Sequence, residues 1–367
     1  MNEADIAAIR AEFAPAPGTA YLDTASYGLP PRATVAALDE AIRAWQAGTA
    51  WWLDDWDRAG EECRAAFAAL IGAETDEIAL LPTVSVGIAA VAASLRAGDD
   101  VLVPEEEFTS VLFPFIVAAE RVGARVRRAP FRTLPEAVRP ETTLVATSLV
   151  RSQDGALAPL DALLDAAAAH GARVLIDATH AVPFVPLAAR LDRIDYLVCH
   201  GYKHLLCPRG AGFLRVRREG LGDVPPIHAN WRSASPPYAR SYGGDLELPE
   251  SAARFDISLD WFAWVGARPA LDLLVAWQAA GAWEGPLALA ADLADRLGLA
   301  RPGASIVSVP VTDADAAQRA LAAAGVRVSA PNGRLRLSTH VYTTPEHIER
   351  AAAVIVPFVD RGAAPME

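Results

Sequence analysis

The chain has 367 residues, of which 52% are hydrophobic and 21% are charged, and its formal net charge is −12. This length and apolar content allow a large buried core and suggest one large domain with a smaller second one. The acidic balance, with no basic run, argues against nucleic acid or an anionic membrane surface as a partner.

The N-terminus carries acidic residues where a signal peptide needs basic ones, and no apolar stretch reaches membrane-spanning length. The three cysteines, Cys63, Cys199 and Cys207, form no CxxC pair and no plausible disulfide framework. We therefore expect a soluble cytoplasmic protein without a metal site, whose partner is a small molecule.

Taken in chain order, a helical pattern at residues 3–13 is followed by strand patterns that alternate with Ala-rich helical ones. This alternation is typical of crossover units on a parallel sheet and predicts an α/β fold. Good helix candidates are residues 86–95, 110–121 and 159–170. The expected strands are residues 77–81, 100–103, 125–129, 143–147, 173–177, 196–199 and 212–216.

After residue 265 the pattern changes to a long helix at about 267–280, followed by further helices and short strands at 306–309, 326–329 and 335–338. We expect a large domain at residues 15–265. A smaller α+β domain is expected from residues 1–14 and 266–367.

Two expected strands end beside residues with cofactor chemistry. The first, VLID, delivers Asp177 at its end, and the next, YLVC, is followed closely by Lys203. Open α/β sheets bind ligands at the carboxyl ends of their strands, so both side chains are predicted to face one crevice. A lysine can hold an aldehyde as a Schiff base, and a carboxylate can keep a pyridine nitrogen protonated, which together indicate pyridoxal 5′-phosphate. Either residue alone is more often structural.

At these residues the chain resembles the class V aminotransferase family of fold-type I enzymes, which includes cysteine desulfurases, kynureninase, isopenicillin N epimerase-like proteins and carbon–sulfur lyases. The resemblance runs from YLDTAS at residues 21–26, through the Asp177 and Lys203 strands, to RLRLST at 334–339. It implies a mainly parallel seven-stranded sheet, pyridoxal phosphate, and a homodimer with the site at the interface.

A phosphate group needs backbone N–H groups and hydroxyls at a helix N-terminus. Thr83 and Ser85 provide hydroxyls where a strand gives way to an amphipathic helix, although an ordinary N-cap would use the same residues. The resemblance places Val84 and Ser85 on the two positions of the family's phosphate cup. It also suggests His200 and Tyr202 as phosphate or cofactor ligands.

The resemblance assigns three more cofactor contacts. Phe108 lies where a histidine commonly stacks on the ring, and a phenyl ring preserves stacking but cannot relay protons. Phe108 could instead be plain core. His180 matches a position that typically carries a glutamine bonded to the cofactor's phenolic oxygen. Ser152, before the turn QDG at residues 153–155, is expected to approach that oxygen or the substrate carboxylate.

A guanidinium group can hold the carboxylate of an amino acid with two parallel hydrogen bonds. Arg336 lies close to the family's carboxylate-binding arginine, with Arg334 as the alternative on the same strand face. Residues 326–336 contain no cysteine, so persulfide formation as in cysteine desulfurases is not expected. Cys199 and Cys207 flank Lys203 and are interpreted as packing residues.

Tryptophans cluster at residues 45–56 and again at 231 and 261–264. Core packing is the default interpretation, and a subunit interface or a substrate-pocket wall is the alternative. Segments 242–245 and 254–258 are candidates for contributing to the neighbouring subunit's site.

These residues predict β-elimination from a bulky cysteine S-conjugate, with Lys203 as the base. The alternatives are a decarboxylating deaminase, an aminotransferase and an epimerase, and the last would need a second acid such as Tyr242 or His228. A non-catalytic regulator that binds the cofactor is disfavoured, because neither terminus resembles a DNA-binding module.

Overall fold

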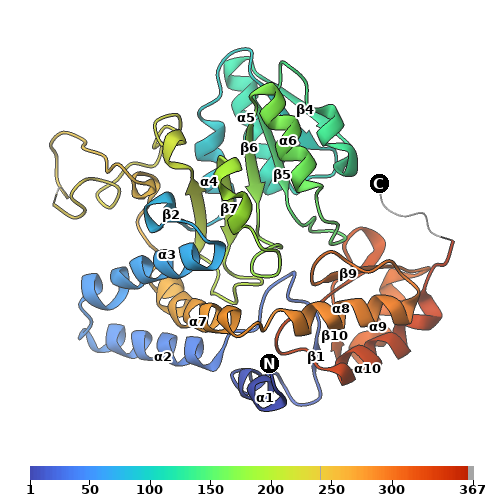
Figure 1. Ribbon diagram of the computed structural model, residues 1–367. Coiled ribbons are helices and arrows are strands. Elements are labelled where there is room, and N and C mark those ends of the chain that lie inside the picture. Colours follow the sequence, from blue (N-terminus) through green and yellow to red (C-terminus); the bar gives the residue numbers. More distant parts are fainter. Residues whose placement is uncertain (240, 363–367) are drawn as a thin grey trace.

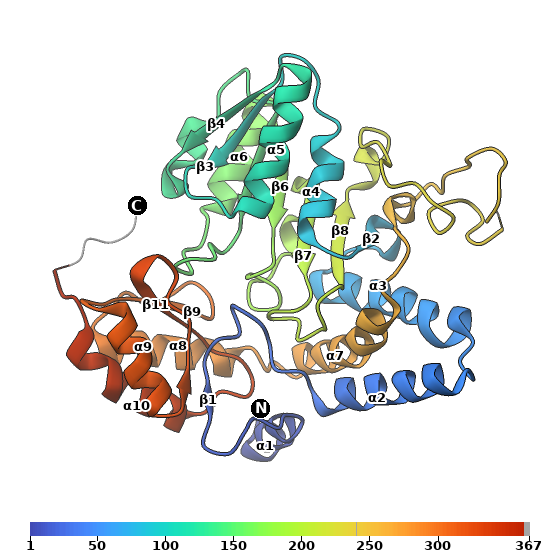
Figure 2. The same ribbon diagram turned by 180° about the vertical axis from the view of Figure 1, so that it is seen from behind.

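A seven-stranded sheet with helices on both faces forms the centre of the molecule (Figure 1, Figure 2). The computed structural model describes residues 1–239 and 241–362. β8 runs antiparallel to both of its neighbours, and the pairs from β7 to β4 are parallel, which confirms the predicted mainly parallel α/β fold. The strand order is β2 (Ile78–Leu81), β8 (Gly212–Val216), β7 (Tyr196–His200), β6 (Arg173–Asp177), β5 (Leu144–Ser148), β3 (Asp100–Pro104) and β4 (Arg125–Ala129).

The inner strands are almost wholly apolar because helices cover both of their faces. One face packs Leu81, Val103 and Leu175 against α4 (Val84–Ala92) and α5 (Thr109–Val122). The other face packs Leu80, Val145 and Phe213 against α6 (Leu160–His170), α3 (Arg58–Ile71) and α7 (Trp261–Ala279). Alternate residues of each strand therefore belong to two separate cores, as the two-residue repeat of a strand requires.

The tryptophan-rich segment lies beside α7. Helix α2 (Arg32–Ala47) packs on α7, and a π-helical segment, η1 (Trp52–Asp57), continues directly into α3. Trp264 is fully buried and contacts Phe213, whereas Trp52 contacts Trp231 and Trp261 near the surface. Core packing thus accounts for Trp264 and for Trp56, which is buried against Trp261 and Phe262. The proposed interface or pocket wall stays a prediction for the others.

The C-terminal part forms a third apolar core. Within it β11 pairs antiparallel with β9, and β1 (Ala20–Tyr21) pairs parallel with β10. The expected domain boundary near residue 265 stays a prediction. α7 packs in the core of the large sheet, and the third core combines α8 and the elements after it with Ala20 and Leu22. The elements of this part are α8 (Glu284–Leu297), β9 (Ile306–Pro310), α9 (Ala314–Ala323), β10 (Val326–Arg327), β11 (Arg334–Ser338) and α10 (Pro345–Ile355).

The N-terminal helix α1 (Glu3–Ala11) contributes Ile9 to the large core. Its side chains are otherwise mostly exposed. The remaining regular elements are short 3₁₀ helices: η2 (Thr75–Glu77), η3 (Phe131–Thr133), η4 (Pro135–Ala137), η5 (Ala188–Arg193), η6 (Arg218–Gly220), η7 (Ala252–Phe255), η8 (Pro331–Gly333) and η9 (Val356–Phe358).

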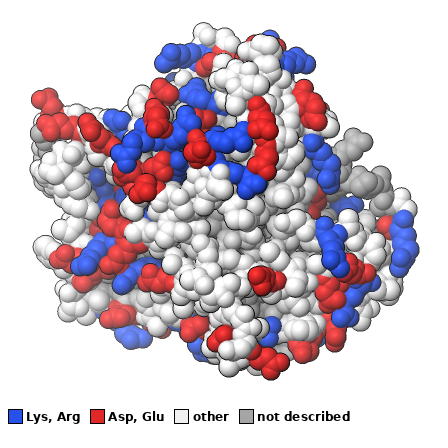
Figure 3. All heavy atoms as spheres, in the orientation of Figure 1, with Lys and Arg blue, Asp and Glu red and all other residues white. Residues whose placement is uncertain are grey.

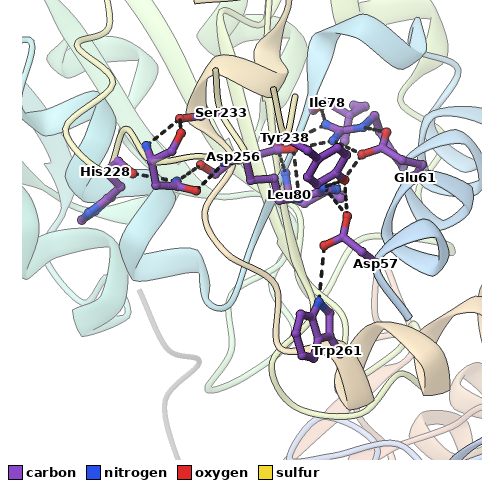
Figure 4. A network of polar contacts seen from close by, with 12 residues as sticks. Asp57, Glu61, Ile78, Leu80, His228, Ser233, Tyr238, Asp256 and Trp261 are labelled. Carbon is purple, nitrogen blue, oxygen red and sulfur yellow. Dashed lines mark hydrogen bonds and ion pairs between the residues drawn. The ribbon is translucent and has the colours of Figure 1, made fainter. Parts of the chain in front are cut away.

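A buried ion-pair network ties the 228–256 segment to α3 and β2 (Figure 4). Arg232 Nη1 donates to Asp57 Oδ2 at 2.6 Å, and Arg232 Nη2 donates to Glu61 Oε1 at 2.6 Å. Arg64 Nη2 donates to Asp256 Oδ2 at 2.5 Å, and the other oxygen of Asp256 accepts the β2 backbone N–H of Leu80 at 2.8 Å. The network fixes where this irregular segment meets the sheet.

Acidic and basic side chains are interspersed on the face shown in Figure 3. Within residues 1–239 and 241–362, none of the helices is both long enough and apolar enough to cross a membrane. The same part of the chain groups no three His, Cys, Asp or Glu side chains in a way that would hold a metal ion.

Candidate active site

The predicted site residues meet at the carboxyl edge of the parallel strands. β2, β3, β5, β6 and β7 all end at this edge, since β2 is antiparallel to β8 and β8 is antiparallel to β7. One cavity lies there. Among its lining residues are all nine predicted for the cofactor: Val84, Ser85, Phe108, Ser152, Asp177, His180, His200, Tyr202 and Lys203. The structure brings them together, while their individual roles stay predictions.

Lys203 is buried, and its amino group points into this cavity. Nζ lies 2.9 Å from His180 Nε2 and 5.5 Å from the centre of the Phe108 ring. Burial lowers the pKa of Lys203 to about 8, Arg336 adds to that shift, and Asp177 opposes it. A neutral amine is therefore accessible close to physiological pH, as a nucleophile or a base requires.

The sequence holds a signal for Lys203 beyond its position: it is the only lysine of the chain, so 32 of the 33 Lys and Arg residues are arginine. Arginine serves equally well for surface charge. Its guanidinium stays protonated, however, and cannot act as an amine nucleophile or base. A single lysine, buried at a strand end, is therefore a specific mark of amine chemistry.

Asp177 ends β6, and its carboxylate is buried next to Lys203. Oδ1 accepts the backbone N–H of Thr179 at 2.9 Å, and Thr179 Oγ1 accepts the backbone N–H of His200 at 3.0 Å. Burial raises the pKa of Asp177, while the Thr179 hydrogen bonds and the Lys203 charge oppose the shift. A cationic partner such as a protonated pyridine nitrogen would favour its ionised form.

The N-terminus of α4 forms the end of the cavity expected to hold a phosphate. No side chain caps this helix, and the hydroxyls of Thr83 and Ser85 lie 3.0 Å apart. Nearby, His200 Nδ1 is buried and has no hydrogen-bond partner among the described residues. Free helix N–H groups, two hydroxyls and an unpaired imidazole nitrogen fit an anionic group.

Arg209 also lines the cavity, with its guanidinium carbon 5.2 Å from the centre of the Tyr202 ring. The sequence did not indicate Arg209, because it reaches the cavity only through the folded path of the chain between β7 and β8. Thr179, Ser110 and Ser148 line the cavity as well and were also missed.

Phe108 is not a core residue, since 47% of its surface is exposed. It is the N-cap residue of α5, and the buried carboxylate of Glu107 holds the turn by accepting the backbone N–H groups of Phe108 and Ser148, each at 2.7 Å. The partly exposed ring thus lines the cavity at a place fixed by the start of α5. This place suits stacking against a flat ligand.

Arg336 is a buried cation for which no carboxylate partner lies within ion-pair distance among the described residues. Its guanidinium nitrogens donate to neutral groups: Nε to Ser329 Oγ at 3.2 Å, Nη1 to the Ser152 carbonyl oxygen at 2.8 Å and Nη2 to Ser26 Oγ at 2.9 Å. Burial lowers its pKa. A desolvated guanidinium without a counterion indicates an anionic ligand.

Arg334 points elsewhere. Its Nε donates to Ser308 Oγ at 3.0 Å, and it lines a different cavity with Asp154. Sequence alone left the two arginines as alternatives. Arg336 does not line the cavity itself but donates to Ser152, which does, and its role in holding a carboxylate stays a prediction.

The N-terminal loop completes the surroundings of Arg336. Gly28 lies against the Lys203 turn, where a Cβ atom would come 2.3 Å from the Lys203 carbonyl oxygen, so only glycine allows the approach. This contact places Ser26 beside Arg336, and Ser26 Oγ donates to Asp23 Oδ1 at 2.7 Å. The family-like segment at residues 21–26 was an available signal for Ser26.

The other expected contributors lie apart from this cavity. Tyr242 is 97% exposed, and His228 does not line the cavity. In the 254–258 segment, Asp256 is buried in the ion-pair network of its own chain. Their contribution to a neighbouring subunit stays a prediction.

All three cysteines are buried, and burial is the largest cause raising the pKa of each thiol. None of them lines the cavity. Thiols in such surroundings are poor nucleophiles, which agrees with their interpretation as packing residues.

Comparison with known proteins gives a consistent picture. A family model described as aminotransferase class-V matches residues 20–350. Isopenicillin N epimerase from Streptomyces clavuligerus is 28% identical over 338 residues, which cover 79% of this chain and 82% of that protein. A probable cysteine desulfurase from Aeropyrum pernix is 29% identical over 248 residues, covering 63% of this chain and 60% of that protein.

Solved structures share the fold along almost the whole chain. The cystine C–S lyase C-DES, in complex with its reaction product cysteine persulfide, superposes with a TM-score of 0.83 at 21% identity over 94% of this chain and 99% of that one. A lysine-to-alanine mutant of C-DES, with glycine covalently linked to its PLP cofactor, gives a TM-score of 0.84 at 20% identity over 95% of this chain and 99% of that one. At these identities the likeness establishes the fold.

Proposed function

This chain belongs to the class V aminotransferase family of pyridoxal phosphate-dependent enzymes, and on that premise we propose that it is a lyase that eliminates the β-substituent of an amino acid. The proposed substrate class is a bulky cysteine S-conjugate. The single observation that carries the proposal is the sole lysine of the chain, buried at the cavity floor with the hydrocarbon ring of Phe108 across from it.

Each part of the cofactor and substrate is assigned to different residues of the site. The bound cofactor supplies a pyridine ring that stores the electron pair released at the α-carbon. Asp177 keeps the ring nitrogen protonated, and the α4 N-terminus with Thr83 and Ser85 holds the phosphate. Arg336 holds the substrate carboxylate, which supplies the anion that its buried guanidinium lacks among the residues the structure describes.

Lys203 is the base in this scheme. Its amine takes the proton from the α-carbon, the released electron pair forms the bond between the α- and β-carbons, and the bond from the β-carbon to sulfur breaks with the thiolate as leaving group. Water then converts the enamine product into pyruvate and ammonia. The low pKa of Lys203, about 8, suits an amine that must be neutral to accept this proton.

Elimination needs a base on one side of the substrate only. Phe108 lines the same cavity, 5.5 Å from the lysine amine, and carries no proton-transfer group, which supports elimination over two-base epimerisation. The half-exposed ring of Phe108, which lines the cavity with Tyr202, offers an aromatic surface on which a bulky substituent on sulfur would pack. The buried thiols argue against a desulfurase that forms a persulfide on its own cysteine.

Epimerisation is the second candidate, because the relative with 79% coverage of this chain is an isopenicillin N epimerase. It requires an acid opposite Lys203. In the homodimer that we also propose, a neighbouring subunit is the expected source of that group, for example through Tyr242 or His228.

The test is a product assay on the purified holoenzyme with an S-aryl cysteine, an S-alkyl cysteine and free L-cysteine. We expect pyruvate, ammonia and thiol in equal amounts from the conjugates, and slow turnover of free cysteine. Carbon dioxide with an aldehyde would instead indicate a decarboxylating deaminase, and a keto acid formed with an amino acceptor would indicate an aminotransferase. Loss of optical activity without bond cleavage would contradict the lyase proposal in favour of the epimerase.

A further inference from the structure

Next to Lys203 lie three buried histidines, His180, His204 and His340, to which the proposed reaction assigns no step. His180 Nε2 is 2.9 Å from Lys203 Nζ, and His180 Nδ1 is 3.3 Å from His204 Nε2. His204 is completely buried against Phe184 and His340. Lys203 is therefore linked to His204 through a single imidazole ring.

Both rings are neutral in these surroundings. Burial lowers the pKa of His180 and of His204 well below the usual range, and the Lys203 charge adds to both shifts. A neutral imidazole carries one proton, and the hydrogen bond made by one ring nitrogen decides whether the other is a donor or an acceptor. The bond between the two rings therefore determines what His180 presents to Lys203.

The far side of His204 indicates where its proton lies. Its Nδ1 is buried and has no hydrogen-bond partner within the described chain, and the nearby His340 Nε2 donates to the His204 carbonyl oxygen at 3.0 Å. A buried N–H without an acceptor is rarer than an acceptor without a donor. His204 thus carries its proton on Nε2 and donates it to His180 Nδ1.

We propose that His204 is a positioning residue for Lys203: by donating to His180 Nδ1, it fixes His180 as the tautomer whose Nε2–H faces the lysine amine. This inference deepens the proposed function and rests on it only for its catalytic meaning. An N–H that faces Nζ is best accepted by the lone pair of a neutral amine, and it disfavours an ammonium group at the same place. His204 would then keep Lys203 in the form that reacts.

Other groups also act on Lys203, and the test has to leave them unchanged. They lie on several elements around the cavity, and a substitution at His204 keeps all of them in place. Those with a resolved electrostatic effect on Lys203 are Asp177, Arg336, Cys199 and Arg209.

The experiment uses the full chain without added cofactor and needs no activity measurement. Because Lys203 is the only lysine, lysine labelled with ¹³C at the ε-carbon gives one NMR signal, whose pH titration reports on this amine directly. The variant is His204→Gln, whose amide can accept from His180 Nδ1–H as well as donate to Nδ1. We expect its lysine midpoint to lie higher than in the unmodified chain by about one pH unit, a tenfold change in the ammonium–amine equilibrium.

The matched control is His340→Gln, which removes another buried histidine of the same cluster and keeps a donor for the His204 carbonyl oxygen. It should leave the lysine midpoint unchanged. Histidine labelled with ¹⁵N gives a second readout, in which two-bond correlations should show the proton of His180 on Nε2 in the unmodified chain. Circular dichroism would check that both variants are folded.

A proton found on His180 Nδ1 would overturn the proposal. So would a lysine midpoint that shifts equally in the two variants, because His204 would then act only through packing. Failure of the proposed function looks different: added pyridoxal phosphate would give no visible absorption band, while the tautomer and the lysine titration could still be measured.

Discussion

The network around Arg232 and the cavity around Lys203 both bury ionisable side chains, but they treat the charges differently. Arg232 has a side-chain exposure of 1%, and the carboxylates of Asp57, Glu61 and Asp256 lie within ion-pair distance of it (Figure 4). Arg336 is also buried, but among the described residues its hydrogen-bond partners are neutral. Burial of a charge is tolerated where the chain supplies its counterions, and where the chain does not, a ligand is expected to supply them.

The largest effect is expected from a substitution in the Lys203 cavity. Lys203→Ala should abolish the visible absorption band and lower turnover by at least about 10³-fold, since it removes both the covalent anchor and the base. Borohydride reduction of the unmodified holoenzyme should fix the cofactor to the peptide that contains Lys203, which mass spectrometry would identify. An absorption band retained in the variant would place the covalent anchor elsewhere, with the chain's N-terminal amine as the remaining candidate.

Removing the central cation of the Arg232 network should destabilise the fold. Arg232→Met should lower the free energy of unfolding by about 3–5 kcal/mol, because it leaves buried carboxylates without their counterion. Urea denaturation followed by circular dichroism would measure this. Arg190→Met is the control: its partner Asp161 is exposed, so a much smaller change is expected. Equal effects in the two variants would contradict the structural role of the network.

Arg336→Ala tests whether this buried cation binds the substrate, in contrast to Arg232, which is expected to stabilise the fold. It should raise KM by a factor that corresponds to about 2–4 kcal/mol of lost substrate binding, because the substrate carboxylate loses its partner. The cofactor absorbance should stay unchanged. Arg334→Ala on the same strand is the matched control and should leave KM close to that of the unmodified enzyme. An unchanged KM in Arg336→Ala would mean that the carboxylate binds elsewhere, or that it is the group removed in the reaction.

The smallest effect is a shift along the pH scale. Lys203 in the protein without cofactor should titrate near pH 8 instead of its ordinary 10.5, because burial disfavours the ammonium form. Between these two values the unfolded chain binds more protons than the folded one, so the free energy of unfolding should increase as pH rises through this window. The lysine NMR signal reports the midpoint, and a value near 10.5 would show that the amine is solvated.

Much of the site could be predicted from the chain because its chemistry is tied to strand ends. The strands that precede Asp177 and Lys203 are apolar on both faces, and parallel strands bring their carboxyl ends to one edge, so two local patterns sufficed to pair these residues. Helices α2 and α3 and the π-helical segment between them were not among the predicted helices. In this region the sequence showed only a cluster of tryptophans. Their packing could not be predicted, because Trp52 contacts Trp231 and Trp261, which are far away in the chain.

The residues that sequence reasoning missed reach the site through long-range contacts. Ser26 comes beside Arg336 because Gly28 packs on the Lys203 turn, and Arg209 returns through the turn between β7 and β8. The choice between Arg334 and Arg336 is of the same kind. Both lie on one strand face, and only the packing of β11 against the 151–155 turn separates them.

The amino-acid sequence by itself determined the α/β class, the strand ends that carry Asp177 and Lys203, and the single lysine available for covalent chemistry, because periodicity and residue type are local properties of the chain. Only the tertiary structure decided which of Arg334 and Arg336 is buried beside Ser152 of the cavity, and that His180 and His204 follow one another next to Lys203. Burial and pairing depend on neighbours that are distant in sequence, and these neighbours set the electrostatic environment of each ionisable group.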